Sequence, residues 1–292
     1  MDADALDRAL VTELQRDGRA TFEALAKATG LSRPAVTTRM RRLLDAGIVT
    51  IVGVVHPSVF GLTAYAHLGI TVSGPVLPAA ELIAEHPDVP FLTAVAGRFS
   101  LVAEVRCADQ QAMASAIRQI AGAPGVRRVE TSVYTEIRKD THFPPGPYLQ
   151  TPVDDVDRGL LTHLCRDGRA SFADLAEGVG LSTSAARARV LRLLESGAVH
   201  VGARLNASAW GAPVLTGFEV TLGGDSEPAV STLGRLAQVQ YLATAVGRSD
   251  VIGTALTYAA DETLRLLEDV RALPGVHGLE AWTHLHVLKE SY

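Results

Sequence analysis

Residues 17–32 read DGRATFEALAKATGLS, and residues 167–182 read DGRASFADLAEGVGLS, 150 positions later. The sequence PGV at 124–126 returns with the same offset at 274–276. Residues 1 to about 145 therefore recur, without a gap, in residues 151–292. A period this long exceeds that of solenoid repeats. Fusion of two protomers of a protein that once dimerised explains it.

Each copy begins with three predicted helices. In the first copy, apolar residues at helical spacing, among them Leu6, predict a helix over about residues 3–15 and a second over residues 22–28. Gly30 then permits a tight turn, and Ser32 caps a third helix, which ends near residue 47. The second copy repeats this pattern, so both copies predict a helix-turn-helix domain.

The third helix of the first copy has two distinct faces. Spacing of 100° per residue places Val36, Met40, Leu43 and Leu44 on one face, which we expect to be core. The opposite face can donate to phosphates and base edges, and no acidic residue interrupts residues 32–44. A solvated helix face would also be charged, but the tight turn, the lack of acids and the duplication favour DNA. The predicted DNA-binding residues are Ser32, Arg33, Pro34, Thr37, Thr38, Arg41 and Arg42.

The second head carries a different set of residues at the same positions. Its predicted DNA-binding residues are Ser182, Thr183, Ser184, Arg187 and Arg192. Leu191 stands where the first head has Arg41, which predicts weaker phosphate contact. We therefore expect an operator with two unlike half-sites.

The remainder of each copy predicts a ferredoxin-like βαββαβ unit. Residues 48–55 form an expected strand that leaves the head, because they are β-branched and apolar. One face of the following sheet takes the helices, so the open face must bury itself against a partner, for which the other copy is the nearest candidate. The expected strands are 63–72, 90–95, 101–107 and 126–138, then 214–222, 239–245, 251–258 and 276–288; the expected helices are 78–85, 109–121, 228–236 and 260–272.

These elements predict an α+β fold with two winged-type helix-turn-helix heads and two ferredoxin-like domains in tandem. The predicted domains are 1–50 (head 1), 51–140 (ferredoxin-like domain 1), 141–155 (proline-rich linker), 156–200 (head 2) and 201–292 (ferredoxin-like domain 2). The chain is thus expected to be a covalent pseudo-dimer.

Composition limits the possible functions. The N-terminus lacks a basic segment before an apolar core, and no apolar run approaches the roughly 20 residues that cross a bilayer, so we expect a cytoplasmic protein without a membrane partner. The net charge of −5 predicts no general affinity for nucleic acid, so DNA binding must come from a local basic face.

Catalytic and metal-binding patterns are missing from the sequence. It has no phosphate-binding glycine loop, no paired metal-ligand spacing and no nucleophile elbow. Cys107 and Cys165 occupy non-equivalent positions of the repeat, which indicates packing residues rather than a disulfide or metal site. We therefore expect no catalytic residue, no metal and no cofactor apart from a small effector.

The ordered set of these features resembles the Lrp/AsnC family of bacterial and archaeal feast/famine regulators. The resemblance covers both copies nearly end to end. The residues that carry it in the first copy are Leu6, Asp7, Leu14, Asp17, Gly18, Arg19, Leu25, Ala26, Gly30, Leu31, Ser32, Arg39, Leu43 and Gly47. It implies a transcription regulator whose C-terminal (RAM-type) unit binds an amino acid or similar effector and mediates assembly, so we expect double-stranded DNA, an effector and further copies of the chain as partners.

The family's effector turn has the pattern Gly, x, x, Asp, in which the carboxylate helps to hold the ligand. Gly247, Arg248 and Asp250 keep this pattern, whereas Gly97, Arg98 and Ser100 have lost the acid, and a bulky Phe99 lies between them. A carboxylate can pair with an α-ammonium and a serine cannot, so the first pocket is expected to be silent or altered. The alternative is that Asp250 only stabilises a hairpin turn.

Two other interpretations remain open. The architecture also resembles siroheme decarboxylases, enzymes that act on a tetrapyrrole and do not bind DNA. Such an enzyme would need basic and histidine residues after each head, yet residues 51–64 offer only His56 and residues 201–214 only Arg204, while His284 and His286 are expected to be exposed on the last strand. The other interpretation is a regulator whose second head has lost specific DNA contact.

Overall fold

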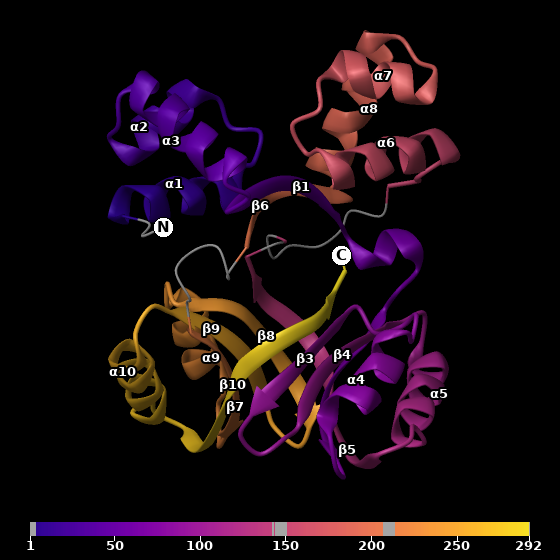
Figure 1. Ribbon diagram of the computed structural model, residues 1–292, viewed down its shortest axis with the longest axis vertical. Helices are drawn as coiled ribbons and strands as arrows, with labels where there is room; N and C mark the ends of the chain where they lie inside the picture. The colour runs from indigo at the N-terminus through magenta and orange to yellow at the C-terminus, as the bar shows by residue number, and fades with distance from the viewer. Residues whose placement is uncertain (1–3, 142, 144–150, 207–213, 292) are drawn as a thin grey trace. The chain divides into compact units, whose positions relative to one another are not determined.

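The computed structural model of the chain describes residues 4–141, 143, 151–206 and 214–291 (Figure 1). The chain divides into two compact units, Met1–Val59 with Thr141–Pro213, and Phe60–Asp140 with Val214–Tyr292. The first unit holds both heads and the second holds both sheets, so each unit combines matching parts of the two copies. The predicted α+β class is confirmed.

The first unit contains two three-helix heads. Head 1 consists of α1 (Ala5–Arg16), α2 (Phe22–Thr29) and α3 (Arg33–Asp45); head 2 consists of α6 (Asp155–Arg166), α7 (Phe172–Val179) and α8 (Thr183–Glu195). Side-chain caps begin these helices, as at Asp4, whose carboxylate accepts from the Asp7 amide while Asp7 accepts from the Asp4 amide. Such reciprocal caps satisfy amides that lack partners within the helix.

The strands that leave the two heads pair with each other. β1 (Val49–Val55) and β6 (Val199–Leu205) form an antiparallel ribbon in which Val49 faces Leu205 and Val55 faces Val199. Each strand also lies against the first helix of the other copy, β1 against α6 and β6 against α1, where His200 Nε2 is 2.7 Å from the Gln15 carbonyl oxygen. The short 3₁₀ helix η1 (Pro57–Phe60) follows β1.

The second unit is a closed eight-stranded barrel in the order β10-β3-β4-β2-β5-β8-β9-β7. Figure 1 shows α4 and α5 on the outside of the first copy's strands and α9 and α10 on the outside of the second copy's strands. The first copy supplies β2 (Ala64–Val72), α4 (Val76–Ala84), β3 (Phe91–Ala96), β4 (Leu101–Cys107), α5 (Gln110–Ala121) and β5 (Val126–Asp140); the second supplies β7 (Val214–Leu222), α9 (Glu227–Arg235), β8 (Val239–Gly247), β9 (Val251–Thr257), α10 (Ala260–Arg271) and β10 (Val276–Glu290).

The two sheets join edge to edge. The last strand of each copy extends beyond its own sheet and pairs with the hairpin of the other copy, β5 with β8 up to Asp140 opposite Tyr241, and β10 with β3 up to Glu290 opposite Phe91. Both last strands are therefore two residues longer than predicted, ending at Asp140 and Glu290 rather than at 138 and 288. The sheet faces turned away from the helices line the barrel interior.

One predicted core position is wrong. Leu44 is 38% exposed, although helical spacing placed it on the core face of its helix, and Leu6, which helped to predict the first helix, is 40% exposed. Each lies beside the apolar stripe of its helix, which is filled by Leu10, Val11 and Leu14 in α1 and by Val36, Met40 and Leu43 in α3.

Among the described residues, no helix combines the length and apolarity that a membrane span requires.

Candidate functional site

Helix α3 presents the predicted DNA-binding face of head 1. Ser32 caps the helix, and its Oγ accepts from the Ala35 amide at 3.4 Å. Val36, Met40 and Leu43 are buried against the rest of the head, which leaves the opposite face to solvent. That face exposes Ser32, Arg33, Pro34, Thr38, Arg41 and Arg42, whereas Thr37 is half-buried.

Helix α8 presents the equivalent face of head 2. Ala186, Val190 and Leu193 are buried, and Ser182 caps the helix through the Ala185 amide at 3.3 Å. The face exposes Ser182, Thr183, Ser184 and Arg187, whereas Arg192 is half-buried. Leu191, in the place of Arg41, is 38% exposed, so this face includes an apolar residue.

A buried aspartate holds the third helix of each head to the first. Asp7 has no exposed surface, and its carboxylate accepts from Arg39 at 2.8 Å and from Arg42. In head 2, Asp157 accepts from Arg189 at 3.0 Å and from Arg192 at 2.5 Å. Arg42 and Arg192 were predicted only as DNA contacts, and the structure gives both a role inside the head.

The aspartate that caps the first helix belongs to the same cluster. A hydrogen bond from Arg39 lowers the pKa of Asp4, and the Asp7 amide contributes. In head 2, the Asp157 amide and then Arg189 lower the pKa of Asp154. Recurrence of Asp7 and Arg39 at the same offset in the second copy was the signal that could have revealed these pairs in the sequence.

Three arginines of the two faces remain available for a polyanion. Arg33, Arg41 and Arg187 are exposed and form no ion pair with any described residue. A guanidinium with five donors in water can bind phosphate at little desolvation cost. Head 1 thus has two such arginines and head 2 has one.

The two predicted effector turns lie at hairpins of the barrel. Gly97 and Gly247 have φ angles of +151° and +143°, within the range that favours glycine. A Cβ atom on Gly247 would lie 2.6 Å from the Thr131 carbonyl oxygen on the strand that closes the barrel. The glycine is required there because the last strand of the other copy passes so close.

Asp250 and Ser100 make the same structural contact. Asp250 Oδ2 accepts from the Leu222 amide at 2.7 Å, and Ser100 Oγ accepts from the Val72 amide at 3.3 Å. The two amides are equivalent in the repeat, so both side chains stabilise the end of a strand. The carboxylate of Asp250 is exposed, which leaves it accessible to a ligand as well.

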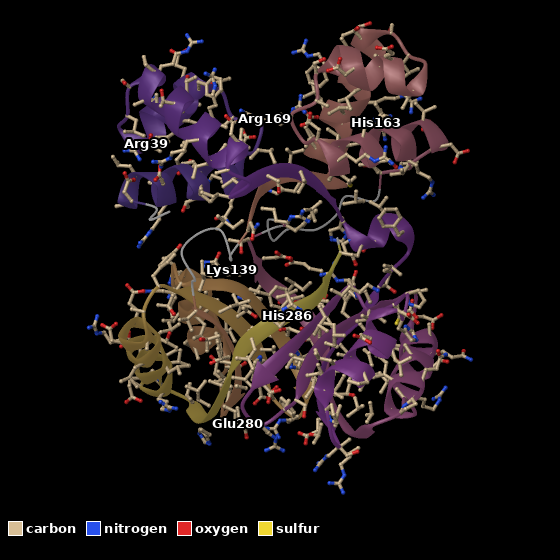
Figure 2. All side chains as sticks on the ribbon, in the orientation of Figure 1. Arg39, Lys139, His163, Arg169, Glu280 and His286 are labelled. Atoms are coloured by element: carbon tan, nitrogen blue, oxygen red, sulfur yellow. The ribbon has the colours of Figure 1, made fainter. Side chains whose placement is uncertain are left out.

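Both turns contribute to one cluster of charges, and Figure 2 labels Glu280 within it. Arg98 lies 3.1 Å from Glu130 and 3.4 Å from Glu280. Arg248 lies 3.0 Å from Glu130 and also pairs with Glu280. Arg248 in addition donates to Glu219 at 2.8 Å. Each arginine therefore binds carboxylates from both copies, and an acidic ligand would have to displace one of them.

Burial and charge oppose each other in this cluster. Burial disfavours ionisation of Glu130, but the hydrogen bond from Arg98 and the charge of Arg248 outweigh it, so the pKa of Glu130 is lowered. Burial raises the pKa of Glu219 despite the bond from Arg248. Sequence patterns did not predict these glutamates, because long-range strand pairing brings them to the turns.

The barrel interior holds two histidines, His67 and His284, of which His284 was expected to be exposed. His67 is 5% exposed, its Nε2 lacks a hydrogen-bond partner among the described residues, and it lies 3.8 Å from Glu219. Both ring nitrogens of His284 are likewise buried without a partner, so the expectation that His284 is exposed is wrong; His286 is exposed as expected. Burial lowers the pKa of His67 to about 3 and that of His284 to about 4, so both are neutral.

The described residues form neither a metal site nor a disulfide. No group of three or more histidine, cysteine, aspartate or glutamate side chains is placed to hold a metal ion there. Cys107 is buried and Cys165 is half-buried, and both are free.

Two family models match the chain. The model for the AsnC-type helix-turn-helix domain matches residues 4–44 and again residues 153–194. The model for the Lrp/AsnC ligand binding domain matches residues 66–142. The matches cover both heads and the first ferredoxin-like domain.

Similar proteins correspond to one copy each. The HTH-type transcriptional regulator LrpA of Mycobacterium tuberculosis is 35% identical over 145 residues, which are 49% of this chain and 97% of LrpA. The HTH-type transcriptional regulator FL11 of Pyrococcus horikoshii is 24% identical over 140 residues, which are 47% of this chain and 93% of FL11. Near-complete matches that span half of the chain agree with a fusion of two copies.

One solved structure is similar over nearly the whole chain. It is the siroheme decarboxylase NirDL in co-complex with an iron-uroporphyrin III analogue, with a TM-score of 0.68 and 14% identity. The match covers 98% of this chain and 93% of NirDL. At this identity the similarity establishes a shared fold and carries no information about activity.

Proposed function

The chain belongs to the Lrp/AsnC family, and from this membership we propose that it is a sequence-specific transcriptional regulator that binds double-stranded DNA as a covalent pseudo-dimer. The observation that carries the proposal is the exposed face of α3, where Arg33 and Arg41 are available to phosphates. Most contacts that position a protein on DNA are made to phosphates, and arginine suits them. The division into heads, ferredoxin-like domains and linker, with a cytoplasmic location, is part of the proposal.

The DNA-contact set that we propose is narrower than the predicted one. Its exposed donors are Arg33, Thr38 and Arg41 of head 1 and Thr183, Ser184 and Arg187 of head 2. Ser32 and Ser182 contribute chiefly as helix caps, and Arg42 and Arg192 through their bonds to the buried aspartates. The difference between the two sets supports an operator with unlike half-sites.

Selection of fragments from the genomic DNA of the source organism tests the proposal. The intact chain should enrich a small set of sequences, and Arg33→Ala combined with Arg41→Ala should abolish the enrichment. Arg265→Ala combined with Arg271→Ala changes the charge equally on the other unit and is the matched control. Enrichment that survives in the first variant, or none with the unaltered chain, would refute the proposal.

We also propose that the second turn, which contains Asp250, binds a small effector. The exposed Asp250 carboxylate could pair with the ammonium group of an amino acid, beside Arg248. The first turn offers Ser100 instead, and Phe99 is buried there at 4% exposure. We propose one responsive turn per chain. Repeating the DNA selection with pooled amino acids should change the enriched set or its affinity.

Association of whole chains is also proposed. Leu77 and Leu82 on α4 are 54% and 48% exposed, and Leu264 on α10 is 59% exposed. Apolar surface of this kind is commonly covered by a partner. Light scattering should therefore give a multiple of 30.9 kDa, and the mass of one chain would count against association.

An enzyme of the siroheme decarboxylase type is the second candidate. The buried ring nitrogens of His67 and His284 favour it, and the fold that the chain shares with NirDL is compatible with it. The regulator is favoured because relatives of up to 35% identity are named as regulators, whereas NirDL is 14% identical. Titration with siroheme separates the two candidates, since an enzyme of that type should shift the absorption spectrum of the added tetrapyrrole.

A further inference from the structure

We propose that two reciprocal arginine clamps fix the distance between the recognition helices and thereby set the half-site spacing that the chain accepts on DNA. A clamp here means Arg19 with Phe172, or Arg169 with Phe22. The inference rests on the proposed DNA-binding function.

The first clamp joins head 1 to the loop that begins α7 of head 2. Arg19 donates through Nη1 to the Gly168 carbonyl at 2.6 Å and through Nη2 to the Ala170 carbonyl at 3.0 Å. Its Cζ lies 5.0 Å from the centre of the Phe172 ring. A guanidinium that binds two carbonyls and an aromatic face cannot shift without breaking several contacts at once.

The second clamp repeats the arrangement in the opposite direction. Arg169, labelled in Figure 2, donates through Nη2 to the Ala20 carbonyl. Its Cζ lies 5.6 Å from the centre of the Phe22 ring. Both guanidiniums are half-buried, and this burial lowers their pKa. Both contacts are therefore stronger than those of exposed arginines.

The clamped loops rest on the β1–β6 ribbon. The Gly18 amide donates to the Val201 carbonyl at 2.8 Å, and the Gly168 amide donates to the Ile51 carbonyl at 2.9 Å. A Cβ atom on Gly18 would lie 2.8 Å from Ile51 Cγ2, and one on Gly168 would lie 2.7 Å from Val201 Cγ1. Only glycine allows this approach, so the ribbon and the clamps together define one arrangement of the heads.

The clamps act on the recognition helices through the preceding helices. Phe172 is the first residue of α7, and Phe22 is the first residue of α2. These helices pack on α8 and α3, and their Leu175 and Leu25 are buried. Two recognition helices read half-sites about one helical turn apart, some 34–36 Å, or at multiples of it, so their separation must be fixed for spacing to matter.

The clamp arginines differ from the arginines proposed to bind phosphate. A groove of about 670 Å³ between the heads is lined in part by Arg19, Arg33 and Arg169. Arg33 has no partner among the described residues, whereas both clamp arginines bind carbonyls of the opposite head. Loss of a clamp should therefore widen the range of accepted spacings rather than simply weaken DNA binding.

The test uses the full chain with Arg19→Ala and Arg169→Ala combined. Arg16→Ala with Arg166→Ala, exposed residues at the ends of α1 and α6, is the matched control. Phe22→Leu with Phe172→Leu, which retains the hydrogen bonds, is a milder variant in case the first one folds poorly. Affinity is measured on operators whose half-sites are moved in single base-pair steps.

The unaltered chain and the control should prefer one spacing, with a loss of about tenfold or more on a two-base-pair shift, in keeping with the cost of a mismatched contact. The clamp variant should bind the best spacing within a few-fold of the unaltered chain and lose most of that preference. A variant that is weaker by the same factor at every spacing, or an unaltered chain without spacing preference, would overturn the proposal.

A second measurement separates this inference from the proposed function. Spin labels at Asp45→Cys and Glu195→Cys, with Cys165→Ser, report the distance between the ends of α3 and α8 without DNA. The distance distribution should be narrow in the unaltered background and broader in the clamp variant, and equal widths would refute the clamps. If the chain selects no DNA at all, the proposed DNA-binding function is wrong. The widths of the distance distributions then still show whether Arg19 and Arg169 hold the two heads at one distance.

Discussion

Phe99 and Trp282 pack ring to edge inside the barrel, with ring centres 6.1 Å apart, at the positions that the repeat gives to Ser249 and Ser132. Those two serines also meet, with 3.4 Å between their hydroxyl oxygens. One junction between the copies is thus filled by aromatic rings and the other by hydroxyl groups. The two copies have diverged into complementary halves, as a covalent link between them permits.

Truncation of the aromatic junction should destabilise the barrel strongly. Trp282 is 4% exposed, so Trp282→Ala should lower the free energy of unfolding by about 3–5 kcal/mol, through lost burial and the cavity that remains. Ser132→Ala at the equivalent position should cost about 1 kcal/mol. Chemical denaturation of both variants checks this, and equal losses would show that the junctions are not specialised.

Asp7→Asn should destabilise head 1. The variant removes the charge that binds Arg39 and Arg42, so the free energy of unfolding should fall by about 2–4 kcal/mol. The exposed Asp45 at the end of α3 provides the control, since Asp45→Asn should change the free energy of unfolding by about 0.5 kcal/mol or less. Denaturation followed by helix circular dichroism measures both. If Asp7→Asn leaves the free energy of unfolding unchanged, the ion pairs of Asp7 with Arg39 and Arg42 do not stabilise the head.

Acid should destabilise the barrel through its buried histidines. The pKa of His67 is about 3 and that of His284 about 4 in the folded protein, against an ordinary value of 6.5. Below pH 6.5 the unfolded chain therefore binds more protons than the folded chain, and stability falls as the pH falls toward 4. The slope should be about 1.4 kcal/mol per pH unit for each histidine.

Denaturation between pH 7.5 and 5 checks this expectation. His67→Gln should remove about half of the slope below pH 6.5, whereas His286→Gln, at an exposed position, should leave it unchanged. If His67→Gln retains the full slope, burial of the neutral imidazole is not its source.

Asp250→Ser should separate the structural role of this residue from ligand binding. Serine can accept from the Leu222 amide as Ser100 accepts from the Val72 amide, so the turn should persist while the charge is lost. Calorimetry with the effector found by selection should then show a loss of affinity of about tenfold or more, the cost of a charged hydrogen bond. Ser100→Ala is the control. Unchanged affinity in Asp250→Ser would remove Asp250 from the effector site.

Local sequence patterns predicted most elements of the fold. Apolar periodicity and glycine positions gave the six head helices and the βαββαβ order, and the strands Leu101–Cys107 and Val214–Leu222 have the predicted bounds. These elements are fixed by neighbouring residues, so the sequence specifies them directly.

The pairing of strands that are distant in the sequence was not predicted. The β1–β6 ribbon and the closure of the barrel depend on registers between strands of different copies. His284 is buried because the pairing of β10 shifts between His284 and His286, so simple alternation does not hold there. Helical spacing places Arg42 on the solvent-facing side of its helix. Its contact with Asp7 becomes visible only in the folded head.

Footprinting of the intact chain on a selected operator tests whether the two heads bind unlike half-sites of DNA. The unaltered chain should protect two unlike half-sites. Arg41→Ala should weaken protection of one of them and lower the slope of log affinity against log salt by about 1, as loss of one phosphate contact requires. Leu191→Ala, at the equivalent position of head 2, should leave that slope unchanged. If no site is protected, if the two half-sites are identical, or if Arg41→Ala weakens both equally, the two heads do not read unlike half-sites as proposed.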